Sequence, residues 1–197
     1  DRSGSMSEGD KWTTVRKVVS EMIGRIGVRA TFGAAVFPDP KSTNSCKPGV
    51  EVMSLRRGDN PPKIDGPVAK QFLALTPTNE GGATPTAATL RALEPKLDGL
   101  AGTTYVVLAT DGGPNCNGQA DCGPELCIPN IENQPIQCVP NAEPNCCKTQ
   151  NGGDPSSCLD GAGLITAVKA LKSKGVATYV LGIPGSAPYA SLLDQVA

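Results

Sequence analysis

The spacing of hydrophobic residues along the chain predicts alternating helices and strands. Between Lys11 and Ile26, apolar residues recur at intervals of three and four, which is typical of a helix with one buried face. The run YVVLA at 105–109 is short and continuously apolar, as in a strand that is buried on both faces. By the same reasoning, strands are predicted over 28–37, 51–55, 105–109 and 177–183, and further helices over 67–75, 86–97, 159–174 and from Ser191 onward.

This alternation predicts an α/β fold, namely a doubly wound, mainly parallel sheet with helices on both faces. Ligands of such folds bind beyond the carboxyl ends of the strands. An α/β chain rarely opens on a polar loop, and the chain begins with DRSGSM. We therefore expect a fragment in which the first strand and the end of the last helix are truncated.

Composition excludes several classes of function. The 197 residues carry 18 basic and 19 acidic side chains, a net charge of −1, so no nucleic-acid partner is expected. No apolar run approaches the roughly 20 residues that a membrane-spanning helix needs. The chain contains no histidine. Serine–histidine and cysteine–histidine catalysis are therefore excluded within it.

Three polar segments are expected at the same edge of the predicted sheet. DRSGSM at 1–6 precedes the first helix, GGATPT at 81–86 precedes another, and ATDGGPN at 109–115 follows the strand YVVLA. Hydroxyl and carboxylate oxygens with only two charges are the ligands that Mg²⁺ or Mn²⁺ prefers, and Ca²⁺ is the weaker match. The candidate metal ligands are Asp1, Ser3, Ser5, Thr84 and Asp111.

These segments resemble the metal-ion-dependent adhesion site (MIDAS) of the von Willebrand factor type A (vWA) domain family, whose pattern is Asp-x-Ser-x-Ser, a distant Thr and a distant Asp. The resemblance covers nearly the whole chain, and residues 1–197 are interpreted as a fragment of one vWA domain with a Rossmann-like fold. It implies that both serines and Thr84 coordinate the metal directly, while Asp1 and Asp111 act largely through water. It further implies a non-enzymatic adhesion module whose metal shell is completed by a carboxylate of an extracellular or surface protein.

The middle segment departs from the family pattern and leaves an alternative open. The family often has Gly-Gly-Thr, whereas this chain has Gly-Gly-Ala-Thr-Pro-Thr. Thr84 is the preferred ligand because the predicted helix begins after it. Thr86 is the alternative, and its other expected role is to cap that helix. Glu80 is expected to be a solvated loop charge, or else an acceptor outside the direct ligands.

Eight cysteines indicate a disulfide-bonded protein of an oxidising compartment, either extracellular, at the cell surface or periplasmic. Seven of them fall within residues 113–158, which we call the cysteine-rich insertion. Since seven is odd, the eighth, Cys46, is expected to crosslink its loop to the insertion beside the metal site, with a partner that the sequence does not specify. The candidate disulfide residues are Cys46, Cys116, Cys122, Cys127, Cys138, Cys146, Cys147 and Cys158.

Two other metal sites within the insertion remain alternatives. Cys122 and Cys127 have a loose zinc-ligand spacing, although no histidine accompanies them. Asn115, Asn117 and Asp121 would form a small calcium loop, but their spacing differs from that of an EF-hand, and asparagines are common in turns.

Two other functions are also left open. A metal-dependent hydrolase would use a metal-activated water, with Asp39, Glu80 or Asp121 as weak candidates for a general base. An intracellular protein that assembles complexes would use the same fold, but it would keep its cysteines reduced.

Overall fold

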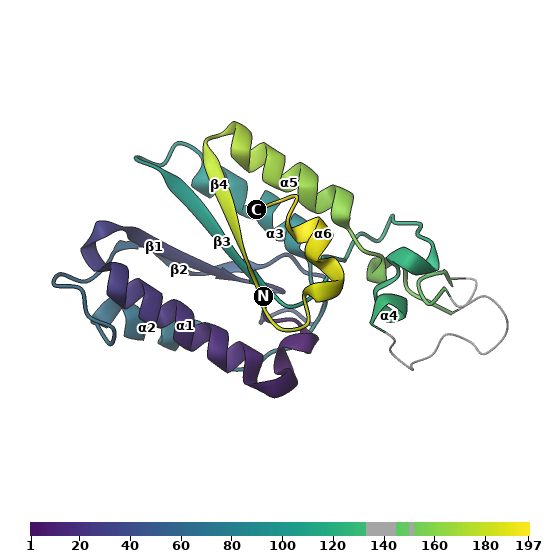
Figure 1. Cartoon of the computed structure of the whole chain (residues 1–197), viewed down its shortest axis with the longest axis horizontal. Coiled ribbons are helices and arrows are strands. Elements are labelled where there is room, and N and C mark those ends of the chain that lie inside the picture. The colour runs from purple at the N-terminus through teal and green to yellow at the C-terminus, as the bar shows by residue number, and fades with distance from the viewer. Residues whose placement is uncertain (133–144, 150–151) are drawn as a thin grey trace.

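The computed structural model describes residues 1–132, 145–149 and 152–197, which form a mixed α/β arrangement (Figure 1). The helices over 11–26, 67–75 and 86–97 have the limits that the sequence predicts. The strands are β1 (Thr31–Val36), β2 (Val50–Arg57), β3 (Thr104–Thr110) and β4 (Val176–Gly182). The helices are α1 (Lys11–Ile26), α2 (Pro67–Leu75), α3 (Thr86–Leu97), α4 (Ile128–Ile131), α5 (Gly161–Ser173) and α6 (Ala190–Leu193), with short 3-10 turns between them.

The strands form two separate two-stranded sheets among the described residues. β1 pairs with β2 in antiparallel orientation, whereas β3 pairs with β4 in parallel, from Thr104 opposite Val176 to Thr110 opposite Gly182. The prediction of one doubly wound, mainly parallel sheet is therefore not met in this form, and only the alternation of helices and strands is confirmed.

The reason lies between β1 and β3, which are not hydrogen-bonded to each other. The segment that lies there is Asp1 and Arg2. The Arg2 amide donates to the carbonyl of Phe37, just beyond β1, at 2.8 Å, and the Asp1 nitrogen donates to the carbonyl of Ala109 in β3 at 3.0 Å. Backbone contacts therefore join the carboxyl ends of β1 and β3 through these two residues, but no ladder runs along the strands.

Helices cover each sheet on one face, and apolar side chains fill the space between them. Against β1 and β2, Ile23 of α1 packs with Met53, Ala69 and Phe72, all less than a tenth exposed. Against β3 and β4, helices α3, α5 and α6 bury a larger cluster (Figure 1). Its most deeply buried members include Ala87, Leu90, Leu164, Leu171 and Val176.

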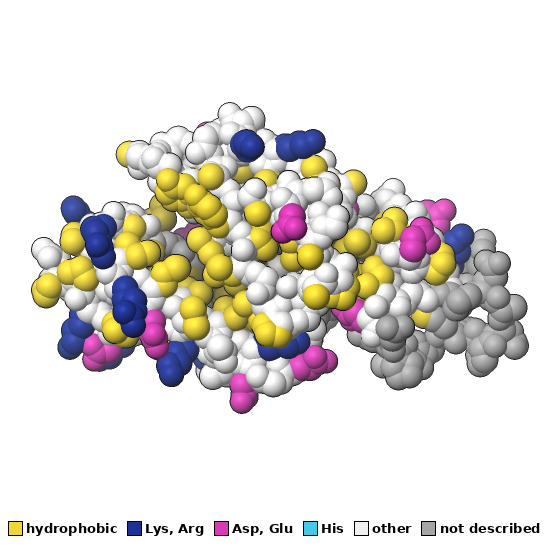
Figure 2. Space-filling view, in the orientation of Figure 1, with side chains coloured by type: hydrophobic (Ala, Val, Ile, Leu, Met, Phe, Trp, Pro, Cys, Tyr) yellow, Lys and Arg dark blue, Asp and Glu magenta, His cyan; other side chains and the backbone are white. Residues whose placement is uncertain are grey.

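The opposite face of β3 and β4 carries exposed apolar side chains. Tyr105 and Tyr179 are each 55% exposed, with ring centroids 5.7 Å apart, and Val107 and Leu181 lie beside them. Figure 2 shows hydrophobic side chains gathered on this side of the molecule. A cavity of about 190 Å³ continues this surface towards Val18 and its neighbours on α1. Tyr105 and Val107 in β3, like Tyr179 and Leu181 in β4, are two residues apart and therefore lie on the same face of the sheet.

The cysteine-rich insertion is held by disulfides. Cys122 is bonded to Cys158 and Cys127 to Cys147, and the backbones of Cys127 and Cys158 form an antiparallel bridge. This pairing contradicts the zinc alternative, because Cys122 and Cys127 have no thiolate to offer. Cys138 lies outside the described residues.

A third disulfide joins Cys46 to Cys116, across 70 residues of sequence. It is the expected crosslink between the loop after β1 and the insertion. No cysteine among the described residues is free, Cys146 included. Within those same residues, no helix is long and apolar enough to cross a membrane.

Candidate metal centre

The first predicted segment folds into a tight loop in which the Asp1 carboxylate is fully engaged. Its Oδ1 accepts a hydrogen bond from the Ser3 amide at 2.8 Å, and its Oδ2 accepts one from the Thr110 hydroxyl at 2.6 Å. Asp1 is 8% exposed, Ser3 2% and Thr110 2%. A buried carboxylate needs such partners, since leaving it unpaired would cost several kcal/mol. Thr110, which the sequence analysis did not single out, therefore fixes the orientation of Asp1.

Four of the five candidate ligands lie in one continuous group of contacts. The hydroxyl oxygens of Ser3 and Ser5 are 3.2 Å apart, and the Ser5 hydroxyl donates to Oδ1 of Asp111 at 2.8 Å. The Asp111 side chain has no exposed surface. Because Asp111 directly follows β3 and Ser5 precedes α1, segments more than 100 residues apart in sequence meet at this edge.

Thr84 is the fifth candidate, and its hydroxyl borders the same space. A Cβ placed on Gly112 would stand 3.6 Å from the Ser5 hydroxyl oxygen and 3.9 Å from that of Thr84. Asn115 makes two hydrogen bonds to the Thr84 backbone. Its side-chain oxygen accepts from the Thr84 backbone amide at 2.7 Å, and its backbone amide donates to the Thr84 carbonyl at 2.9 Å. Asn115 is therefore a positioning residue that the sequence analysis assigned to another role.

A glycine lets the loop with Thr84 approach the first segment. Gly82 has a φ of +89°, which favours glycine, and a Cβ there would stand 2.6 Å from the ring of Pro38. Its carbonyl accepts a hydrogen bond from the Gly4 amide at 2.9 Å. We call residues 1–5, 82–84 and 110–112 together the metal-site edge.

Thr86 and Glu80 lie in other surroundings. The Thr86 hydroxyl donates to the Thr84 carbonyl at 3.4 Å, and the N-cap of α3 is Pro85, so the expected capping role of Thr86 is wrong. Glu80 is half-buried, and its negative charge favours the charged form of Arg2. Burial lowers the pKa of Arg2, and the charge of Glu80 only partly opposes this.

Lys11, the first residue of α1, places a positive charge at the edge. Its Nζ donates to Oδ2 of Asp111 at 3.0 Å and to the Ser5 carbonyl at 3.2 Å. Burial lowers the pKa of Lys11, but its hydrogen bonds to Asp111 and Glu8 outweigh burial, and the net pKa is raised. A lysine at the start of the helix that follows DRSGSM was the signal available in the sequence.

The donor set fits a small divalent cation. The hydroxyl oxygens of Ser3, Ser5 and Thr84 and the buried Asp111 carboxylate come together from three segments, and the buried Asp1 carboxylate is bonded to the Ser3 amide. Mg²⁺ and Mn²⁺ bind such hard oxygen ligands and usually retain some water. The residues that would hold the ion are the five that the sequence predicts.

Two of the three residues in the calcium alternative have their side-chain oxygens in hydrogen bonds within the protein. The side-chain oxygen of Asn115 accepts from Thr84, as described above, and that of Asn117 accepts from the Gln119 amide at 3.2 Å. Asp121 is exposed. The Asn117 contact, to a residue two positions along the chain, is one that asparagines commonly make in turns, whereas the Asn115 contact joins two remote segments.

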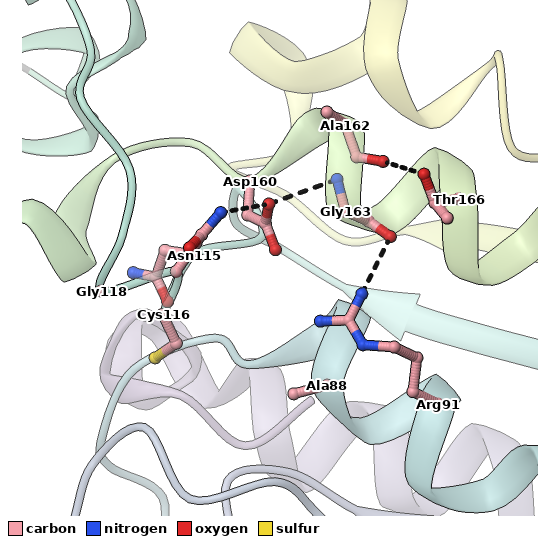
Figure 3. A pocket seen from close by; sticks show the side chains of 10 residues that line it. Ala88, Arg91, Asn115, Cys116, Gly118, Asp160, Ala162, Gly163 and Thr166 are labelled. Carbon is pink, nitrogen blue, oxygen red and sulfur yellow. Dashed lines mark hydrogen bonds between the residues drawn. The ribbon is translucent and has the colours of Figure 1, made fainter.

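A polar cavity of about 360 Å³ lies beside the edge, between α3, the start of α5 and residues 115–118 (Figure 3). Arg91 reaches across it to the Gly163 carbonyl at 3.5 Å. Asp160 caps α5 by accepting from the Gly163 amide, and it also accepts from Asn117 at 3.3 Å. The polar groups facing the cavity are thus largely engaged with one another.

Comparison with known proteins gives one informative likeness. No protein-family model and no curated protein matches the chain. Among solved structures, the chain is similar to the pilus adhesin SpaC from Lactobacillus rhamnosus GG, with a TM-score of 0.57 and 19% sequence identity. The match covers 92% of this chain and 23% of that one, so the chain spans about a quarter of the length of SpaC. At this identity the likeness concerns the fold.

Proposed function

We propose that this chain is a divalent-metal-dependent adhesion module of the vWA type, which binds Mg²⁺ or Mn²⁺ through Asp1, Ser3, Ser5, Thr84 and Asp111. The observation that carries the proposal is the contact group in which the Ser5 hydroxyl lies 3.2 Å from that of Ser3 and 2.8 Å from Asp111. The Thr84 hydroxyl borders the same space. The likeness in fold to a pilus adhesin supports the same conclusion.

The chemistry of the site favours binding over catalysis. Three neutral hydroxyls leave a divalent ion with much of its charge, so a bound ion would supply an electrophilic position for a carboxylate of a protein partner. The chain's own residues orient these donors: Thr110 holds Asp1, Asn115 holds the Thr84 backbone, and Ser5 contacts Asp111. No bond is made or broken in this function.

The disulfides favour an extracellular or surface location for such a module. Three of them are formed among the described residues, and disulfides persist in oxidising compartments. Mass spectrometry of the native protein should find no alkylatable thiol. Eight free thiols would instead favour the intracellular complex-assembling alternative.

Calorimetric titration with Mn²⁺ and Mg²⁺ tests the metal site directly. We expect one site per chain in the native protein and loss of binding in Asp111→Ala. Asp98→Ala is the matched control, because Asp98 is an exposed carboxylate that pairs with Lys174 far from the edge. Equal binding by the native chain and Asp111→Ala would refute the assignment.

The same variant separates adhesion from hydrolysis. If the chain is a metal-dependent hydrolase, generic ester or phosphate substrates should be turned over in a metal-dependent reaction that Asp111→Ala abolishes. For an adhesion module we expect no turnover, together with binding of a carboxylate probe that is lost on addition of EDTA.

A further inference from the structure

Lys11 places a positive charge beside the candidate ligands that the five-residue metal pattern does not explain. Its ammonium lies 3.0 Å from Oδ2 of Asp111, while the other oxygen of that carboxylate accepts from Ser5. The Lys11 side chain is 13% exposed and that of Asp111 is fully buried. The Lys11 ammonium is therefore a positive charge close to the proposed divalent cation, and the two would repel each other.

The remaining charges nearby do not cancel that of Lys11. Glu8 also contacts Lys11, at 3.2 Å, but its side chain is 76% exposed, so water screens it. Arg2 is buried, donates to the carbonyls of Asn79 and Pro38, and is subject to the charges of Glu80 and Asp39. Among the described residues, the charged side chains that hydrogen-bond directly within the group of candidate ligands are therefore the two aspartates and Lys11.

We infer that Lys11 sets the net charge of the metal site, weakening its affinity for the divalent ion and strengthening its affinity for an anionic group of the partner. The inference rests on the proposed function. Asp1, Asp111 and Lys11 together carry one net negative charge, so a divalent ion brings this group of three residues and the ion to one net positive charge. Without Lys11 the loaded site would be neutral, and a carboxylate would gain less on binding.

The size of the effect follows from Coulomb's law. Even at the dielectric constant of water, an ammonium and a divalent ion roughly 6 Å apart would repel each other enough to change the affinity on the order of tenfold. A lower local dielectric would enlarge the change. The effect of Lys11 on the affinity for a carboxylate should be smaller, because a carboxylate carries one charge and the metal ion carries two.

The experiment compares three variants by Mn²⁺ titration, followed by acetate titration of the Mn²⁺-loaded proteins. Lys11→Met keeps the length of the side chain and removes its charge, and Lys11→Arg keeps the charge. Lys17→Met is the matched control, because Lys17 is an exposed lysine on the same helix. Displacement of Mn²⁺-bound water, read from the proton relaxation rate, reports acetate binding.

We expect Lys11→Met to bind Mn²⁺ about tenfold more tightly and acetate more weakly than the native chain. Lys11→Arg and Lys17→Met should resemble the native chain in both titrations. Unchanged or weaker Mn²⁺ binding in a folded Lys11→Met protein would overturn the inference, because Lys11 would then only orient Asp111. Lys11→Gln provides a second neutral variant should the methionine protein fail to fold.

The outcome also separates this inference from the proposed function. If the native chain binds no Mn²⁺ while Lys11→Met does, the proposed function fails for the native chain and the charge role of Lys11 is supported. If neither protein binds Mn²⁺, removing the like charge has no consequence and both are overturned. If the native chain binds Mn²⁺ and Lys11→Met binds it equally, only the role of Lys11 is refuted.

Discussion

The metal-site edge and the cysteine-rich insertion lie next to each other and are held in different ways. At the edge, residues from three remote segments are joined by hydrogen bonds, and the helices that follow them are fixed by apolar packing. In the insertion, the buried cluster consists of Cys127, Cys147 and Cys158, with Cys122 and Cys146 packed against it. The edge therefore depends on the fold around it, whereas the insertion depends on covalent bonds.

The boundary between the two regions is itself crosslinked. Cys46–Cys116 joins the loop after β1 to the root of the insertion, and Asn115, the neighbour of Cys116, contacts Thr84. The Ser45 carbonyl accepts from the Ala83 amide at 3.2 Å on the other side. Thus the insertion contributes to the metal-site edge at its root, and the comparison can be tested by perturbing each region separately.

Reduction of the disulfides should have the largest effect, and most of that effect should fall within the insertion, which holds both cysteines of two bridges. Each bridge contributes typically 2–4 kcal/mol, so loss of Cys122–Cys158 and Cys127–Cys147 should accelerate amide exchange there by roughly 10³-fold or more. Trypsin should then cleave after Lys148, which is exposed and follows Cys147. Hydrogen exchange and limited proteolysis with and without reductant measure this.

The double variant Cys46→Ser/Cys116→Ser is the control for that experiment, because it leaves both bridges inside the insertion intact. Protection around Lys148 should persist in it. Equal loss of protection in α5 and in the insertion after reduction would contradict the separation of the two regions.

Truncation of a core side chain should have the next largest effect and should act on the fold around the edge. Leu164 on α5 is 0% exposed within the cluster under β3 and β4. Leu164→Ala should lower the free energy of unfolding by about 2–5 kcal/mol through lost burial and the cavity left behind. Chemical denaturation measures it, and Leu126→Ala, at a side chain 44% exposed in the insertion, should change little. A larger cost for Leu126→Ala would reverse the comparison.

The helices were the most predictable part of the fold, because their apolar spacing is local. The limits of α1, α2 and α3 follow from that spacing and from the residues that flank it. Sheet pairing was less predictable, since it depends on contacts between distant segments. The strand predicted at 51–55 forms as β2, but neither its antiparallel pairing with β1 nor the separation into two sheets follows from local spacing.

At the metal-site edge, the sequence indicated the candidate donors but not the residues that orient them. Asp1, Ser3, Ser5 and Asp111 form a pattern of residue types. The structure brings the side chains of Ser3, Ser5 and Asp111 into contact, and the Asp1 carboxylate accepts from the Ser3 backbone amide. Thr110 and Lys11 act through contacts across 109 and 100 residues of sequence, which no local spacing reveals.

Replacement of Thr84 should affect metal binding with little effect on stability. Thr84→Val keeps the shape of the side chain and removes the hydroxyl that borders Ser5, so Mn²⁺ affinity should fall by about tenfold or more. Thr86→Val is the matched control, because that hydroxyl contacts only the Thr84 carbonyl among the contacts described, and it should bind Mn²⁺ as the native chain does. Titration of both variants decides between the two threonines, and the reverse order of affinities would identify Thr86 as the ligand.

The smallest expected effect concerns an exposed ion pair that joins β2 to α3. Glu51 of β2 accepts from Lys96 of α3 at 2.5 Å, and Lys96 is 59% exposed. The hydrogen bond from Lys96, followed by that from Ser54, lowers the pKa of Glu51 from its ordinary value of 4.5. A lowered pKa in the folded state adds stability above pH 4.5, and this is lost as the pH falls through the folded-state pKa.

Glu51→Gln should therefore cost less than about 1 kcal/mol at pH 7, because water screens the pair, and the cost should shrink at pH 3, where a larger fraction of Glu51 is protonated. Urea denaturation of both proteins at the two pH values measures the difference. Glu21→Gln should lower the free energy of unfolding even less at pH 7, because the Glu21 carboxylate is 4.0 Å from Arg25. A difference that widens towards pH 3 would show that Glu51 stabilises the fold in its protonated form. The contact between β2 and α3 would then not depend on an ion pair between Glu51 and Lys96.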